Sequence, residues 1–249
     1  MRRANRSRLA RCLAAAVVCW FGACLPTRAG AKFEDTLAQR VLPCATCHGK
    51  EGRAAPDGYY PRIAGKPAGY LLNQLRNFRD GRRHYGLMAG MVEPLSDTYL
   101  QEIASHFAGL ELPYPAPKAA QLGRAELLRG ENLVRQGDAT RQLPACTACH
   151  GSRLTGVLPH VPGLIGLPRD YLNSQLGAWK TGQRRAHAPD CMAQVVRRLG
   201  DEDISAITGW LAAQSVPADA RPAPAPAVRP DSLGAMSCGS APELGAAAR

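Results

Sequence analysis

The pentapeptide pattern C-x-x-C-H occurs twice in this chain and constrains its fold more than any other feature. The first copy begins at Cys44 and the second at Cys146. Two thiols three residues apart on one helical turn can each add to a vinyl group of the same porphyrin, and the adjoining imidazole then lies under the iron. The sequence therefore predicts two covalently bound haem c groups. The attachment residues are Cys44, Cys47, His48, Cys146, Cys149 and His150.

Two other chemistries use closely spaced cysteine pairs. A thioredoxin-type dithiol accompanies a βαβ pattern, and no such pattern is visible in the sequence. A structural zinc site needs four ligands, usually within a compact knuckle. The two pairs are far apart in the chain, and each has its own adjacent histidine. Haem attachment is the interpretation that both motifs satisfy.

The chain also repeats itself around the two motifs. At an offset of 101 residues the matching pairs include Pro61 and Pro162, Gly65 and Gly166, Tyr70 and Tyr171, Gln74 and Gln175, and Gly81 and Gly182. After a three-residue insertion, Met88 matches Met192 and Asp97 matches Asp201. Such a repeat predicts an internal duplication, with one haem in each half.

Apolar spacing and capping residues predict helices in both halves. The expected ranges are 34–41, 67–78, 97–107, 124–135, 168–179 and 201–213. Two of them begin on proline, which suits the first helical turn. No convincing alternating strand pattern is present. The predicted fold is all-α, with two tandem haem-binding domains.

The ends of the chain differ in composition from its centre. A basic start, an apolar run over 12–25 and the A-x-A site at 29–31 predict a signal peptide over 1–31 and export to the periplasm. An uncleaved leader, or lipidation at Cys24, is the alternative and would attach the protein to a membrane. The expected domains are 32–113 and 121–216, joined by a linker at 114–120. The Pro/Ala-rich segment 217–249 is expected to be a disordered tail.

The positive charge of the chain comes mainly from its leader. The whole sequence carries 31 basic and 20 acidic residues, but six of the arginines lie in residues 1–31. The remainder has a net charge of only +5. The basic balance therefore gives no reason to expect nucleic-acid binding.

Each haem iron needs a ligand opposite its histidine. A thioether raises the reduction potential and suits electron transfer, and the matched positions of Met88 and Met192 make them the candidates. His84 and His187 are rival ligands, but they do not match under either offset. Pro61 and Pro162 follow the motifs at similar distances. Their carbonyls could orient the haem-binding histidines, or they could be simple turn prolines.

Two further groups of residues have open roles. Arginines around 76–83, echoed by Arg184 and Arg185, could pair with haem propionates, dock an acidic partner, or form an ordinary solvated face. Cys191 and Cys238 are outside the motifs. In an oxidising compartment they could pair and fix the tail, or Cys191 could remain a buried thiol.

With these residues in place, the chain resembles the cytochrome c4 family over about residues 33–214. The resemblance rests on both C-x-x-C-H-G motifs, Pro61 to Gly65, Tyr70 to Leu75, Gly81-Arg82, Met88 and Leu95 to Asp97. It implies two all-α cytochrome c domains related by a pseudo-twofold axis, with haem propionate edges facing across the interface. By position, His48 and Met88 would ligate the first iron, and His150 and Met192 the second. The carbonyls of Pro61 and Pro162 would orient the two histidines.

The resemblance also implies a function. The family shuttles electrons in the periplasm, from a quinol-oxidising complex or a dehydrogenase to a terminal oxidase or reductase. The leading expectation is therefore a non-enzymatic carrier with redox-protein partners. One alternative is the diheme subunit of an oxidoreductase complex, such as a flavocytochrome sulfide dehydrogenase. Another is a haem that lacks its methionine and binds gases or peroxide.

Overall fold

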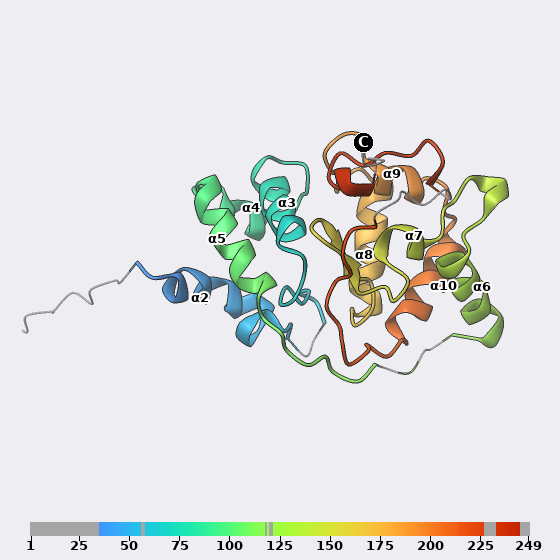
Figure 1. The fold of residues 1–249 in the computed structure, drawn as a ribbon, viewed down its shortest axis with the longest axis horizontal. Helices are drawn as coiled ribbons and strands as arrows, with labels where there is room; N and C mark the ends of the chain where they lie inside the picture. The colour runs from blue at the N-terminus through green and yellow to red at the C-terminus, as the bar shows by residue number, and fades with distance from the viewer. Residues whose placement is uncertain (1–34, 56–57, 118, 120–121, 227–232, 245–249) are drawn as a thin grey trace, which may run out of the picture. The chain divides into compact units, whose positions relative to one another are not determined.

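The computed structural model describes residues 35–55, 58–117, 119, 122–226 and 233–244. The expected signal peptide, 1–31, lies outside the described residues, as do parts of the expected linker and tail. The described residues from Thr36 onward belong to one compact unit, and their helices form two lobes with separate hydrophobic cores. Figure 1 shows the helices of both lobes.

Within the described residues, the first lobe contains four α-helices. They are α2 (Leu37–His48), α3 (Ala68–Arg79), α4 (Gly86–Val92) and α5 (Asp97–Ala108). Side-chain caps define two of the helix starts, because Thr36 accepts from the Gln39 N–H and Ser96 from the Tyr99 N–H. Leu100 and Phe107 of α5 are buried in the core of this lobe, against apolar residues of α3.

The second lobe repeats this plan with additions. Its α-helices are α6 (Arg124–Arg135), α7 (Cys146–His150), α8 (Arg169–Lys180), α9 (Cys191–Val196) and α10 (Asp201–Ala212). A short antiparallel pair, β1 (Gly156–Val157) and β2 (Val161–Pro162), lies between α7 and α8. Periodicity could not predict strands of two residues, because an alternating pattern needs at least four.

The most extensive helix contact in the second lobe is between α6 and α10, which lie side by side in Figure 1. Gly130 of α6 permits this approach. A Cβ atom at this position would lie 2.2 Å from the carbonyl oxygen of Ala206. Any larger residue would therefore push the two helices apart.

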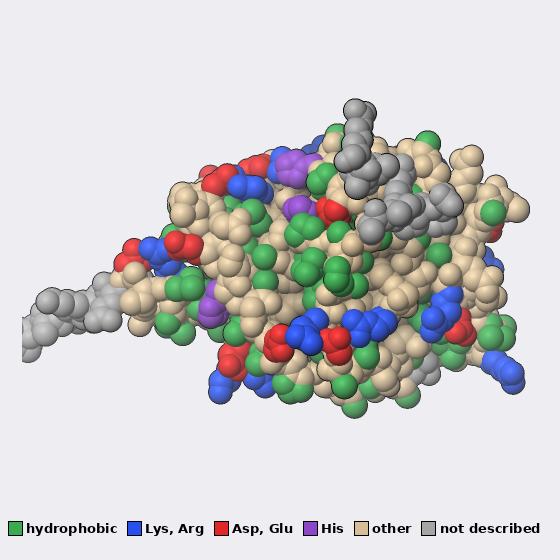
Figure 2. Space-filling model, viewed as in Figure 1, with side chains coloured by type: hydrophobic (Ala, Val, Ile, Leu, Met, Phe, Trp, Pro, Cys, Tyr) green, Lys and Arg blue, Asp and Glu red, His purple; other side chains and the backbone are tan. Residues whose placement is uncertain are grey.

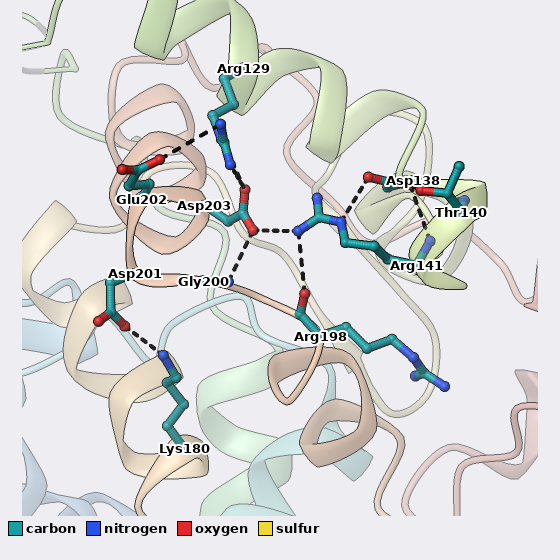
Figure 3. Close-up of polar contacts among 10 residues, drawn as sticks. All are labelled: Arg129, Asp138, Thr140, Arg141, Lys180, Arg198, Gly200, Asp201, Glu202 and Asp203. Atoms are coloured by element: carbon teal, nitrogen blue, oxygen red, sulfur yellow. Dashed lines mark hydrogen bonds and ion pairs between the residues drawn. The ribbon is translucent and has the colours of Figure 1, made fainter.

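A buried carboxylate joins both helices to the segment before the second haem motif (Figure 3). Asp203 of α10 is 1% exposed and accepts from Arg129 of α6 at 2.7 Å. Its other oxygen accepts from Arg141 at 2.7 Å and from the Gly200 N–H at 3.0 Å. Because Arg141 belongs to the short 3-10 helix Ala139–Arg141 that leads to α7, one acidic side chain fixes three segments.

The structure differs from the expectation of a disordered tail over 217–249. Ala223 forms a parallel bridge with Val157 and donates to the Gly156 carbonyl at 2.9 Å. Further along, Leu233 and Leu244 are buried against the second lobe. The composition of the tail is poor in large apolar residues, but these leucines and a disulfide are enough to hold residues 233–244 in place.

The helix that carries the first haem motif is longer than expected. The expected helix over 34–41 instead begins at Leu37 and continues through Pro43 to His48. In the second lobe, α6 ends at Arg135, and the motif forms its own short helix, α7.

Within the described part of the chain, no helix is long and apolar enough to span a membrane. Acidic and basic side chains lie interspersed on the face shown in Figure 2.

Candidate functional site

Each C-x-x-C-H motif ends a helix in its own lobe. Cys44 packs against the core of the first lobe, and Cys146 packs against the core of the second. His48 and His150 are buried, with 8% and 7% of their surfaces exposed. The two cysteine pairs therefore belong to two separate sites, whereas a four-cysteine zinc site would need them together.

A proline carbonyl fixes each motif histidine. Nδ1 of His48 donates to the Pro61 carbonyl oxygen at 2.8 Å. Nδ1 of His150 donates to the Pro162 carbonyl oxygen at 2.7 Å. Because a carbonyl can only accept, the ring proton lies on Nδ1, and Nε2 keeps the lone pair that binds a metal. Both hydrogen bonds expected from the sequence are present.

The glycine after each motif makes the turn that follows. Gly49 has φ of +73° and Gly151 has φ of +82°, in the region that side chains with a Cβ rarely adopt. At Gly49 a Cβ would also lie 2.5 Å from the Ala54 carbonyl oxygen. This turn directs the chain from the histidine toward the segment that carries its proline partner.

Burial acts on the acid–base chemistry of the motif residues. It lowers the pKa of His48 and of His150, which favours the neutral form of the imidazole, the form that can bind a metal. Burial also raises the pKa of the Cys146 thiol to about 12. A dithiol oxidoreductase depends on a thiol pKa below the ordinary value. The buried histidines and the raised thiol pKa fit covalent haem attachment better than dithiol exchange.

The candidate methionines lie at equivalent places in short helices. Met88 is in α4 and packs partly buried against the core of the first lobe. Met192 is in α9 and is also partly buried. The rival histidines are engaged where the lobes meet: the His84 N–H donates to the Gln183 carbonyl, and His187 Nε2 lies 3.3 Å from Arg82.

Two arginines form the centre of the contact between the lobes. Arg83 and Arg184 face each other in an antiparallel bridge. Arg83 donates to the Tyr171 hydroxyl at 3.3 Å, and Arg184 donates to the Tyr70 hydroxyl at 3.5 Å. Burial opposes ionisation of Tyr171, but the charges of Arg83 and Arg184 outweigh it and lower the pKa of that hydroxyl. Two positive charges therefore lie near this hydroxyl at the contact between the lobes.

The structure answers one question that the sequence left open and adds one contact. Cys191 and Cys238 form a disulfide, the first of the two alternatives for this pair. His160 contacts Glu243 through Nδ1 at 3.0 Å. The sequence gives no signal for this contact, because the position of Glu243 depends on how the C-terminal segment folds against the second lobe.

The chain is similar to known diheme proteins, although no family model matches it. The thiosulfate dehydrogenase electron acceptor of Thiomonas intermedia is 39% identical over 172 residues, covering 69% of this chain and 78% of that protein. Reduced cytochrome c4 from Pseudomonas stutzeri matches with a TM-score of 0.62 at 30% identity, covering 72% of this chain and 97% of that one.

A thiosulfate dehydrogenase structure from Marichromatium purpuratum matches equally well, with a TM-score of 0.62 at 30% identity. The match covers 69% of this chain but only 36% of that longer one. These proteins share the tandem cytochrome fold and its paired haem motifs. The chain belongs to the cytochrome c4 family of diheme electron carriers, and its cofactors are two covalently bound c-type haems.

Proposed function

We propose that this cytochrome accepts single electrons in the periplasm from a dehydrogenase that oxidises thiosulfate, and passes them to a terminal oxidase or another redox protein. The carrier function rests on one observation: each lobe holds a C-x-x-C-H helix whose histidine is fixed by a proline carbonyl. The donor is proposed because the relative in Thiomonas intermedia is a thiosulfate dehydrogenase electron acceptor.

The residues of each lobe have complementary tasks in this proposal. The motif cysteines would anchor the haem, and Nε2 of His48 or His150 would bind its iron. Met88 and Met192 would supply the second protein ligand of each iron, because a thioether raises the reduction potential. When bound, each haem supplies a one-electron ferric–ferrous couple. The Pro61 and Pro162 carbonyls hold the Nδ1 proton, which keeps the ring orientation and makes Nε2 more basic.

Arg83 and Arg184 are the proposed counter-charges for haem propionates. Both guanidinium groups are permanently charged, and Arg184 is only 5% exposed. Their hydrogen bonds within the described part of the chain go to glutamine and tyrosine oxygens, not to carboxylates. A buried cation is costly without an anion, and the propionates would supply the missing negative charge at the contact between the lobes.

The first experiment is a visible spectrum with a haem count on the purified protein. Two haems per chain and a weak long-wavelength band from iron–methionine bonds are expected. Met88→Ala and Met192→Ala should each remove about half of that band. If neither variant changes the band, the ligand assignment is wrong.

The donor is tested by mixing the oxidised protein with a thiosulfate dehydrogenase and thiosulfate. We expect reduction of both haems at a rate that depends on dehydrogenase concentration, and no reduction by thiosulfate alone. Rapid reduction by a flavoprotein with sulfide, and none with thiosulfate, would instead assign the chain to a flavocytochrome complex. Localisation is tested separately: the N-terminal sequence of the periplasmic protein should begin near Lys32, whereas recovery with the membrane would indicate a retained anchor.

A further inference from the structure

The C-terminal segment 233–244, here called the strap, lies against the second lobe near α9 (Figure 1). Its Cys238 forms a disulfide with Cys191, the first residue of α9. Met192 is the next residue along that helix. The strap is therefore attached covalently one residue from the axial ligand proposed for the second iron.

Hydrogen bonds continue this attachment along the segment that leads into α9. The Gly239 N–H donates to the Pro189 carbonyl oxygen at 2.9 Å. The His187 N–H donates to the Ser240 hydroxyl at 3.1 Å. A Cβ on Gly239 would lie 2.2 Å from the Ala188 carbonyl oxygen, so glycine is needed for the two chains to come this close. Three consecutive strap residues, 238 to 240, therefore bind to the segment 187–191.

Four residues spread along the strap are buried, between other residues that are exposed. Leu233, Cys238, Ala241 and Leu244 are between 3% and 8% exposed. They pack with Val157 and Val161, and the partly buried Ala148 and Cys149 of the second haem motif join the same cluster. Near its end Glu243 contacts His160, and the Asn73 side chain of the first lobe donates to the Ser240 carbonyl at 3.1 Å. One segment therefore contacts both the second haem motif and the helix that carries Met192.

The first lobe provides a natural comparison because it repeats the second. Its counterpart of Cys191 is Leu87, which is 63% exposed. Thr46, the counterpart of Ala148 in the first haem motif, is exposed as well. Among the described residues, α4 has no disulfide that corresponds to the one between Cys191 and Cys238. The two methionine helices are thus held in different ways.

We propose that the strap is a positioning element for the second haem, and that the Cys191–Cys238 disulfide keeps Met192 on the iron. A six-residue helix such as α9 is not stable alone, so its position depends on what it contacts. Without the disulfide, the methionine segment would gain freedom and release the iron more often. This inference rests on the proposed assignment of Met192 as a ligand.

The test measures ligand binding at each iron in the holoprotein. Carbon monoxide binds a reduced haem only when the sixth position opens, and the iron–methionine band reports the same event. The Cys191→Ser/Cys238→Ser variant should raise the fraction of open second haem by roughly tenfold or more. A chain that ends at Pro226 and carries Cys191→Ser should raise the fraction of open second haem at least as much. Leu87→Ser, the matched change in the first lobe, should leave carbon monoxide binding as in the unchanged protein.

One further variant makes the result decisive. Met192→Ala should bind one carbon monoxide per chain, which calibrates a fully open second site. If Met192→Ala binds carbon monoxide but both strap variants stay closed, the positioning role is overturned while the ligand assignment stands. If Met192→Ala itself stays closed, the ligand assignment fails and the positioning role fails with it. A folded strap variant, verified by its helical circular dichroism, that opens only the second haem confirms the proposal.

Discussion

Arg83 and Arg184, one from each lobe, share the same two hydrogen-bond acceptors. Arg83 donates to Gln74 at 3.0 Å and to Gln175 at 2.6 Å. Arg184 donates to Gln175 at 2.7 Å and to Gln74 at 3.0 Å. Two like charges therefore lie close together between two neutral amides. Burial and the neighbouring Arg83 charge lower the pKa of Arg184, although a guanidinium remains protonated at pH 7.

The first prediction concerns the reduction potential. Arg184→Met removes a buried positive charge that disfavours the ferric state, so the mean potential of the two haems should fall by about 30–60 mV. Arg185→Met, which removes an exposed charge one residue away, is the control and should shift it much less. Spectroelectrochemical titration measures both. An unchanged potential in Arg184→Met would show that the buried pair does not act on the haems.

The second prediction concerns stability. Asp203→Asn leaves Arg129 and Arg141 without their buried carboxylate and should lower the free energy of unfolding by about 2 kcal/mol. Asp201→Asn is the matched control, because Asp201 pairs with Lys180 at 2.5 Å but is 93% exposed (Figure 3). Asp201→Asn should change the free energy of unfolding by no more than about 0.5 kcal/mol. Denaturant titration distinguishes the two, and equal losses would contradict the structural role of Asp203.

The third prediction is the pH dependence of that effect. Burial alone would raise the pKa of Asp203, but hydrogen bonds from Arg141, the Gly200 N–H and Arg129 outweigh it and lower the pKa. The stabilisation is therefore complete above the unfolded-state value of about 3.9 and is lost as the pH falls through the lower folded-state value. The difference in stability between the unchanged protein and Asp203→Asn should shrink below about pH 4. A difference that grows on acidification would be inconsistent with this sign.

The fourth prediction concerns the contact between α6 and α10. Gly130→Ala places a methyl group against the Ala206 carbonyl and should cost about 1–3 kcal/mol of unfolding free energy. Gly177→Ala in α8 is the control, because its Cβ would meet nothing within 4 Å. That change should stabilise the protein by about 0.5–1 kcal/mol, through helix propensity alone. Thermal unfolding followed by circular dichroism would reveal opposite shifts, and a tolerated Gly130→Ala would mean that the helices separate easily.

The sequence predicted the parts of the fold that depend on local patterns. The helix that begins at Asp97 is present with its Ser96 cap, and the helix after Pro168 starts within one residue of its expected position. The repeat placed Met88 and Met192 at equivalent positions, and both lie in short helices. Their roles as ligands remain predictions.

The parts that could not be predicted depend on contacts distant in sequence. Composition describes residues 217–249 as too poor in apolar groups to fold, yet Leu233 and Leu244 are buried because the second lobe supplies the rest of their surroundings. The partners of Asp203 come from two other segments, so no short motif contains them. Local patterns locate helices, whereas these contacts need the assembled lobe.

The disulfide changes how the second lobe transmits mechanical force. Cys191 and Cys238 are 47 residues apart, and the intervening chain contains all of α10. A pull on the C-terminal end reaches α9 through the sulfur–sulfur bond, so the tension bypasses α10 entirely. The contact between α10 and α6 would therefore be protected from this force. In a chain without the crosslink, the same force would separate α10 from α6 first.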